Sequence, residues 1–445
     1  MSCRVTLATR QQIVGNRRKI ATCFYVGFLT FPGLGSKAHF VACDLLAAGS
    51  RDQMSQSSTS ISSHSRSALL DCTKGLACAA IVWHHLAFYG PMSDVAHPVM
   101  PDLLDWLYEY ARMAVQIFLV IGGFLAAASL APQGLSRFDS PWAKIGKRFV
   151  RLLVPYAVAL VMTIVISAAI RPWFDHDSVS ADPDLWQLMA HALLLQGIVG
   201  EESLSAGVWY VSIDFQLFAG TVLLLAGVRW LQQRIAARLG DAAVARCWPW
   251  TVTGAQALVV LGASASLLSF NLDAELDVWA IYFMGAYGIG MMAFWAVAAE
   301  KRITAWSWGM LIAALVIGAL VYEWRDRIFL AGVTAMLLII CMRTEGIARW
   351  KGFAPLRRLG EISYSVFLIH FSICLLVNAV VNHFWHGSVT AAVVGIPFAF
   401  VLSLTAGYAL YQLVECHVSS WNQALRWQAG LIGAGLLTTL LAGLR

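Results

Sequence analysis

The chain has 445 residues, of which 59% are hydrophobic and only 13% are charged, and its formal net charge at pH 7 is +6. Soluble domains carry roughly 25% charged residues, so this composition excludes a soluble domain and indicates a polytopic helical membrane protein. The positive charge gives no reason to expect a nucleic-acid partner, because the Lys and Arg residues fall in alternate loops between apolar runs.

Nine Cys residues are scattered along the chain without a Cys-x-x-Cys pair or a framework of short loops. Four of them lie in or beside apolar runs, namely Cys72, Cys78, Cys341 and Cys374. We expect these to be packing residues. The sequence predicts neither a disulfide scaffold nor a metal site.

The first 66 residues differ from the rest of the chain. Residues 1–19 are polar and basic, and residues 20–34 form a short apolar run. A small-residue cleavage site followed by an exported domain does not come after this run, which argues against a signal peptide. A Ser-rich stretch typical of a disordered leader begins at Met54, which makes Met54 an alternative start of translation. We therefore expect residues 1–66 to be disordered or absent from the mature protein.

Apolar runs long enough to cross a bilayer recur from residue 69 onward with short connections. The sequence therefore predicts an all-α transmembrane bundle of about ten spans with one possible extra C-terminal span. In this prediction residues 67–415 form the membrane domain, and residues 416–445 form a tail with one apolar helix. The runs lie near residues 69–90, 111–131, 149–170, 208–230, 251–270, 278–298, 304–322, 328–342, 361–382 and 390–414, with the further candidate at 428–444.

Lys and Arg residues concentrate in every second loop, which predicts the orientation of the spans because positive charge stays in the cytoplasm. This alternation predicts a cytoplasmic N-terminus and a cytoplasmic start for the helix at residues 69–90. The basic loops lie at residues 137–151, 229–246, 301–302 and 343–358, and the acidic loops lie at residues 94–109, 175–202 and 273–277.

The apolar stretch at residues 185–199 is too short for a comfortable span and has acidic residues on both sides. Counting it as a crossing would invert every later loop, so we predict an interfacial or re-entrant helix on the non-cytoplasmic face. His191 and Gln196 on this helix are expected to face water, and the alternative is that they line a substrate entrance.

The predicted helix at residues 69–90 carries charged and titratable residues for which an apolar helix has no structural use. Asp71 and Lys74 lie near its start, and His84 and His85 lie about three turns further on. The positions from Lys74 to His85 span roughly 16 Å, which places a titratable group near the bilayer midplane. A buried His can be satisfied by a neighbouring helix, but ionisable residues at this depth usually mark a functional site.

Arg148 and Arg151 lie at the predicted cytoplasmic mouth of the third span, after Lys144 and Lys147. A spacing of three places both guanidinium groups on one helix face, where their forked donors suit phosphate. Basic residues also collect at cytoplasmic helix ends for topology alone. The pair by itself therefore does not decide between these two explanations.

Polar residues lie in the first turns of the fourth span, where Asp214 and Gln216 follow Trp209 and Tyr210. The two aromatic residues are expected at headgroup level on the non-cytoplasmic side. The carboxylate of Asp214 is expected to lie beyond the membrane–water interface, where a charged group is costly and suggests a function. It could orient a His side chain or a sugar hydroxyl.

The ninth span begins with Ser363 and Tyr364 and carries a further buried titratable residue, His370. If Glu361 marks the cytoplasmic surface, His370 lies about halfway across the membrane. The second span contains the pair Gly122 and Gly123, which allows close helix packing.

Together these residues resemble acyltransferase family 3, the integral membrane O-acyltransferases that modify O-antigen, exopolysaccharide, periplasmic glucan and macrolides. The resemblance covers residues 66–415. This chain has Lys74 where Arg is more common in the family, and Asp214 where Glu is often found. The motifs that carry the resemblance, in the family's order, are Asp71-x-x-Lys74-Gly75, Lys74-x10-His85, Gly122-Gly123-Phe124-Leu125, Arg148-x-x-Arg151, Trp209-Tyr210 with Asp214, and Ile362-Ser363-Tyr364 with His370.

The resemblance implies acyl transfer across a membrane. Acyl-CoA, with acetyl-CoA as the first candidate, would bind from the cytoplasm with its phosphates at Arg148 and Arg151. Lys74 would contact CoA or pair with Asp71. His85 would act as general base on an acceptor hydroxyl or as a transient acyl carrier.

The acceptor implied by the resemblance is a glycan, a lipid-linked sugar or a small molecule with a hydroxyl group. Asp214 would orient the base or this acceptor. The residues expected to contact substrate or support the site are Asp71, His84, Trp209, Tyr210, Gln216, Ser363, Tyr364 and His370.

Two other function classes are compatible with the sequence. A proton-coupled transporter or flippase for a lipid-linked or anionic solute would use the buried His and Asp residues as a relay, although the two halves show no internal repeat. The second alternative class is a catalytically inactive membrane receptor that senses acyl-CoA. We expect a multi-pass protein of a bacterial inner membrane, in contact with membrane lipids.

Overall fold

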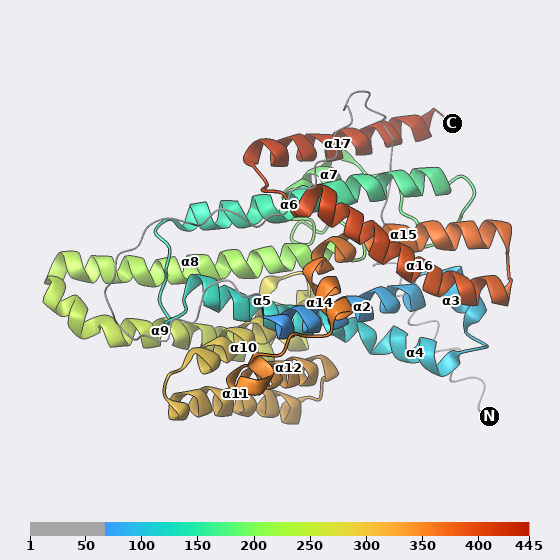
Figure 1. Cartoon of the computed structure of the whole chain (residues 1–445). Helices are drawn as coiled ribbons and strands as arrows, with labels where there is room; N and C mark the ends of the chain where they lie inside the picture. The colour runs from blue at the N-terminus through green and yellow to red at the C-terminus, as the bar shows by residue number, and fades with distance from the viewer. Residues whose placement is uncertain (1–66, 445) are drawn as a thin grey trace, which may run out of the picture.

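The computed structural model describes residues 67–444, including all side chains except those of residues 239, 241–252 and 348. The predictions for residues 1–66, including a start at Met54, lie outside these described residues. From residue 67 to residue 444 the chain forms helices joined by loops, and this part contains no β-strand. The predicted all-α fold class is therefore confirmed (Figure 1).

The long helices follow the predicted apolar runs, and several of them are longer than those runs. They are α2 (Ala68–Phe88), α5 (Val115–Leu130), α6 (Pro141–Ile170), α8 (Val208–Leu239), α9 (Asp241–Leu268), α10 (Ala280–Ala298), α11 (Arg302–Tyr322), α12 (Asp326–Arg343), α15 (Ser363–Phe384), α16 (Val389–Leu410) and α17 (Trp421–Gly443).

Short helices in the connections were not predicted, apart from α7. They are α3 (Pro91–Ala96), α4 (Pro101–Glu109), η1 (Ala111–Ala114), α7 (Leu185–Ala192), η2 (Phe270–Leu272), η3 (Ala274–Leu276), α13 (Glu345–Ala348) and α14 (Ala354–Glu361). A π-helical turn, η4 (Tyr411–Glu415), continues α16.

Eight helical segments of the described chain are long and apolar enough to cross a membrane, which makes the protein a multi-pass membrane protein. They are residues 101–130, 141–170, 208–238, 253–272, 280–298, 302–322, 363–384 and 389–415. The helix α2 falls outside this set because Asp71, Lys74, His84 and His85 lower its hydropathy. The residues that suggest a function are thus the ones that weaken the signal for a span.

The helix α6 begins eight residues before the predicted run at residue 149. Pro141 occupies its first turn, and the side chain of Ser140 accepts a hydrogen bond from the backbone N–H of Ala143 at 3.2 Å. These are standard features of a helix start. The first turns carry Lys144 and Lys147, so a search for apolar residues misses them.

Loops predicted to lie on one side of the membrane do contact each other. Asp139, before α6, pairs with Arg229 near the end of α8 at 2.9 Å. At the predicted opposite side, Arg325 before α12 donates to the side chain of Asn271 between α9 and α10 at 2.9 Å. The grouping of loops that the charge pattern predicts is therefore present in the fold.

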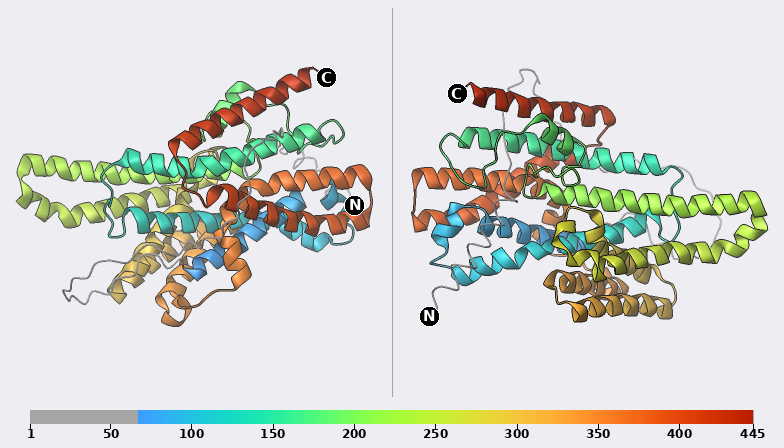
Figure 2. Two further views of the ribbon diagram at one scale, coloured as in Figure 1. Left: turned by 45° about the horizontal axis from the view of Figure 1, so that its top comes forward. Right: turned by 180° about the vertical axis from the view of Figure 1, so that it is seen from behind.

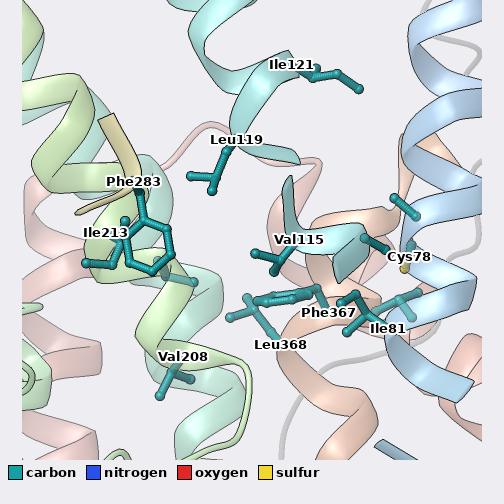
Figure 3. Packing of buried hydrophobic residues seen from close by; sticks show 14 of the residues in the cluster. Cys78, Ile81, Val115, Leu119, Ile121, Val208, Ile213, Phe283, Phe367 and Leu368 are labelled. Carbon is teal, nitrogen blue, oxygen red and sulfur yellow. The ribbon is translucent and has the colours of Figure 1, made fainter. Parts of the chain in front are cut away.

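The core lies where α2, α5, α8, α10 and α15 meet. Figure 3 shows Cys78 and Ile81 of α2 beside Phe367 of α15 and Val115 of α5. The helices α5 and α10 pack with their backbones in contact, because a Cβ added at Gly123 would lie 1.9 Å from the carbonyl oxygen of Tyr287. Small residues allow this approach between transmembrane helices.

The predicted helix at residues 185–199 is shorter than expected, and the chain after it enters the bundle. The helix α7 ends at Ala192, and Gly207 lies so close to α15 that an added Cβ would be 3.0 Å from the carbonyl oxygen of Phe367. The expectation that His191 and Gln196 face water is wrong, since both are fully buried. His191 instead bridges two segments, as its Nδ1 contacts the carbonyl of Gln187 at 2.8 Å and its Nε2 accepts the backbone N–H of Leu204 at 2.7 Å.

The C-terminal helix α17 runs beside α6 and then along α7 (Figures 1 and 2). Trp421 at its start packs against Gly146 and Phe149 of α6. Near its end, the hydroxyl of Thr439 donates to the carbonyl of Pro183 at 3.1 Å. The helix therefore runs in the same direction as α6.

The two hydrogen bonds of His191 predict a pH-dependent stability. Burial lowers the pKa of His191 to about 4, so the unfolded chain binds a proton more readily and a pH below about 6.5 favours unfolding. We expect wild type to be more stable than His191→Leu at pH 7.5, and this difference to shrink by about 3 kcal/mol towards pH 4. Unfolding of both proteins in detergent at a series of pH values measures this difference in stability. A difference that stays constant with pH would contradict the prediction.

Candidate active site

The first predicted site residue, His85, is buried in α2 and contacts His370 of α15. The distance between Nδ1 of His85 and Nε2 of His370 is 2.5 Å, and the two ring planes differ by only 4°. Nδ1 of His370 lies 3.1 Å from the backbone carbonyl oxygen of Val366, one turn earlier in α15. Three groups in a row are thus joined by hydrogen bonds.

This arrangement determines where the ring protons lie. A carbonyl oxygen can only accept, so Nδ1 of His370 carries a hydrogen and donates it to Val366. Burial away from water favours neutral rings, and Nε2 of a neutral His370 is then an acceptor. Nδ1 of His85 must therefore donate to it. As a result Nε2 of His85 keeps its lone pair and can take up a proton.

The neighbouring His84 contacts a different helix from His85. Its Nδ1 lies 3.0 Å from the carbonyl oxygen of Leu107 in α4, and its ring packs on Phe88 with 5.4 Å between centroids. Adjacent residues on a helix point about 100° apart, so the two His residues face different neighbours. His84 fastens α4 to α2, and His85 faces α15.

Asp71 and Lys74 form an ion pair of 2.6 Å on α2, and 23% of the Lys74 side chain is exposed. The helix α14 lies against this turn, because a Cβ added at Gly360 would be 1.7 Å from the carbonyl oxygen of Asp71. The pairing that the resemblance implied for Lys74 is present. The Lys74 side chain is only partly covered, so it can still contact a ligand.

Arg148 of α6 forms an ion pair of 2.5 Å with Asp214 of α8. The same guanidinium lies over the ring of Phe218, at 5.2 Å from its centroid. The sequence placed these two charges near opposite membrane surfaces, and the structure differs because α8 begins beside the middle of α6. Asp214 is thus a partner of Arg148, and the hydrogen-bonded partner of His85 is His370.

Arg151 does not share the partner of Arg148. It is exposed and lies within electrostatic reach of Glu415, as does Lys74. Glu415 accepts a hydrogen bond of 2.6 Å from the hydroxyl of Ser365, and it lies in the π-helical turn η4. Such turns occur often at functional sites. Sequence reasoning missed Glu415, although a single carboxylate directly after the apolar run at residues 390–414 was a detectable signal.

The remaining predicted residues mainly hold helices together. The hydroxyl of Tyr364 donates to the carbonyl of Leu152 in α6 at 2.8 Å, and that of Ser363 donates to the carbonyl of Gly360 at 2.9 Å. Tyr210 packs on Phe367, and Trp209 packs on Phe283; both side chains are half-buried. Gln216 is half-buried on α8.

Within residues 67–444, no group of three or more His, Cys, Asp or Glu side chains is arranged to hold a metal ion. The fold and the buried histidine pair define a multi-pass membrane protein with a candidate proton-transfer site. The model of acyltransferase family 3, described as an acyltransferase domain, matches residues 68–412. The chain therefore belongs to acyltransferase family 3.

One curated relative, described as "Regulator of hypoxia-inducible factor 1" from Caenorhabditis elegans, is 27% identical over 172 residues. This match covers 34% of the chain and 33% of the relative, so the chain matches only about a third of that protein's length. No solved structure matches the chain.

The pair between Arg148 and Asp214 predicts strong coupling between two variants. Asp214→Leu leaves a charged guanidinium without its carboxylate inside the bundle, so we expect a loss of about 3–5 kcal/mol in stability. The double variant Arg148→Met/Asp214→Leu removes both charges and should regain most of this loss. Thermal unfolding in detergent of the two single variants and the double variant tests this, and additive losses would show that the pair is not coupled.

Proposed function

We propose that this acyltransferase moves an acyl group, with acetyl as the first candidate, from cytoplasmic acyl-CoA to a hydroxyl of an acceptor at the other side of the membrane. The acceptor class is a glycan, a lipid-linked sugar or a small molecule. His85 is the general base in this proposal. The protein would act in a bacterial inner membrane, with its N-terminus in the cytoplasm.

The observation that carries the proposal is the hydrogen-bonded row from Val366 through His370 to His85. It fixes one tautomer of His85 and leaves Nε2 as a base, about 16 Å along α2 from the charged turn at Lys74. A base held in one orientation is what general base catalysis on a hydroxyl requires. Family membership supplies the reaction class.

The chemical step follows from this geometry. Nε2 of His85 takes the proton of the acceptor hydroxyl while its oxygen attacks the thioester carbonyl carbon. The new ester C–O bond forms and the C–S bond to CoA breaks. The departing thiolate then takes the proton from His85, so that the free thiol of CoA is released and the base is restored.

The donor phosphates are assigned to Lys74 and Arg151 in this proposal. Arg151 is exposed, and the Lys74 side chain is partly exposed. Arg148 is less suited to this role, because Asp214 already occupies its guanidinium. The two arginines have different partners, so Arg151, and not the pair of arginines, is assigned to the phosphates together with Lys74.

The test is release of free CoA by the purified protein in detergent, offered acetyl-CoA and longer acyl-CoAs. A general base contributes roughly 10²–10⁴-fold to a rate, so we expect His85→Gln to slow release by at least about 10²-fold. His370→Ala should also slow it, because the ring of His85 loses the partner that fixes its tautomer. His84→Gln is the matched control, and it should retain most of the activity.

Two results would contradict the proposal. Equal effects of His84→Gln and His85→Gln, with both variants folded, would mean that the two rings are structural. If no acyl-CoA binds and no CoA is released, the donor assignment fails. Solute transport with His85 in a proton relay would then be the function to measure.

A further inference from the structure

A cavity of about 260 Å³ lies between α6, the π-helical turn η4 and the first turns of α17. The cavity is open to the surface, since Leu413 and Val418 in its lining are 76% and 94% exposed. Its lining consists of Val154 of α6, Leu413 and Val414 of η4, His417, Val418 and Ser419 of the following loop, and Gln423 and Trp427 of α17. Seven of its eight lining residues come after residue 412, where the match to the family ends. The cavity is therefore built mostly by a part of this chain that the family match does not cover.

The lining combines ring surfaces with hydrogen-bonding groups. Trp427 and His417 offer aromatic faces, and Ser419 and Gln423 offer polar ones. The Oε1 atom of Gln423 accepts the backbone N–H of Ser420 at 2.9 Å, which orients the side chain and leaves its NH2 group to donate. A hydrocarbon chain would pack on the four aliphatic residues of the lining, but it would leave the donors and acceptors of Ser419 and Gln423 unused. A flat heterocyclic ring uses both kinds of group, since it stacks on aromatic faces and carries polar atoms at its edge.

The cavity adjoins the positive charges assigned to the donor phosphates. Val154 lies three residues after Arg151, on the same face of α6. Leu413 lies two residues before Glu415, a carboxylate within electrostatic reach of Arg151 and Lys74. A ligand with a heterocyclic ring in the cavity would therefore hold its phosphates beside these cations.

We propose that this cavity binds the nucleobase of the acyl-CoA donor, with Trp427 stacking on the ring and Gln423 donating to its edge. The inference rests on the proposed function. From the phosphate position at Lys74 and Arg151, the flexible pantetheine arm extends along α2 towards His85, roughly 16 Å from Lys74. The nucleotide and the reacting carbonyl thus have separate sites, joined by that arm.

Binding of adenosine 3′,5′-bisphosphate tests the cavity without any acyl transfer. This probe contains the base, the ribose and two of the three phosphates of CoA, and it lacks the pantetheine arm. We expect calorimetry on the full-length protein in detergent to show binding that Trp427→Ala weakens about tenfold. Trp427→Phe should restore most of it. The matched control is Trp421→Ala, because Trp421 lies on the same helix but packs on Phe149.

Turnover of two donors separates this inference from the proposed function. Trp427→Ala should raise the KM for acetyl-CoA about tenfold with little change in kcat, and it should leave the KM for acetyl-pantetheine unchanged. If wild type turns over acetyl-CoA and Trp427→Ala leaves its KM unchanged, the nucleobase site is overturned and the acyltransferase proposal stands. If wild type neither binds the bisphosphate nor releases CoA, both fail.

A membrane lipid is the competing occupant, and the same variants address it. If Trp427→Ala reduces the phospholipid retained by the purified protein in native mass spectrometry, while bisphosphate binding is unchanged, the cavity is a lipid site and the inference is overturned. Unchanged lipid retention with weakened bisphosphate binding supports it.

Discussion

The ion pair between Arg148 of α6 and Asp214 of α8 sets the position of α8 in the bundle. Arg148 is the eighth residue of α6, and Asp214 is the seventh residue of α8, which runs in the opposite direction. The start of α8 must therefore lie beside the middle of α6, and its far end extends about 25 Å beyond the start of α6. Figures 1 and 2 show this extension, which α9 shares. The same constraint explains why residues 193–207 enter the bundle, since they must reach that deep starting point.

The sequence predicts the fold class and the centres of the long helices because apolar runs report directly on burial in a membrane. It does not predict helix ends such as those of α6 and α8, since their outer turns are charged and outside the apolar runs. The short helices α3 and α4 contain too few residues to show a period. The sequence does not predict the burial of His191. A polar residue on a short apolar helix carries no information about the later loop, at Leu204, that covers it.

The candidate site was only partly predictable for a similar reason. His85 and His370 were both selected from their depth in apolar helices, but the hydrogen bond between them joins residues 285 positions apart. The sequence does not predict that Asp214 pairs with Arg148, because the apolar runs place these two residues near opposite membrane surfaces. Only the structure identifies Glu415 as a candidate, through its hydrogen bond with Ser365 and the charges of Arg151 and Lys74 within electrostatic reach. Contacts of this kind depend on the relative axial positions of the packed helices. The hydrophobic periodicity of each helix does not determine these positions.

The row of hydrogen bonds at His85 ends on a peptide carbonyl. In the part of the chain that the structure describes, neither ring of the pair is hydrogen-bonded to a carboxylate, so a proton gained by His85 would have no fixed negative charge to stabilise it. An imidazolium in such surroundings is a high-energy species, and the departing thiolate would be the first strong base within its reach. The site is thereby suited to pass a proton along during a turnover and unsuited to store one between turnovers.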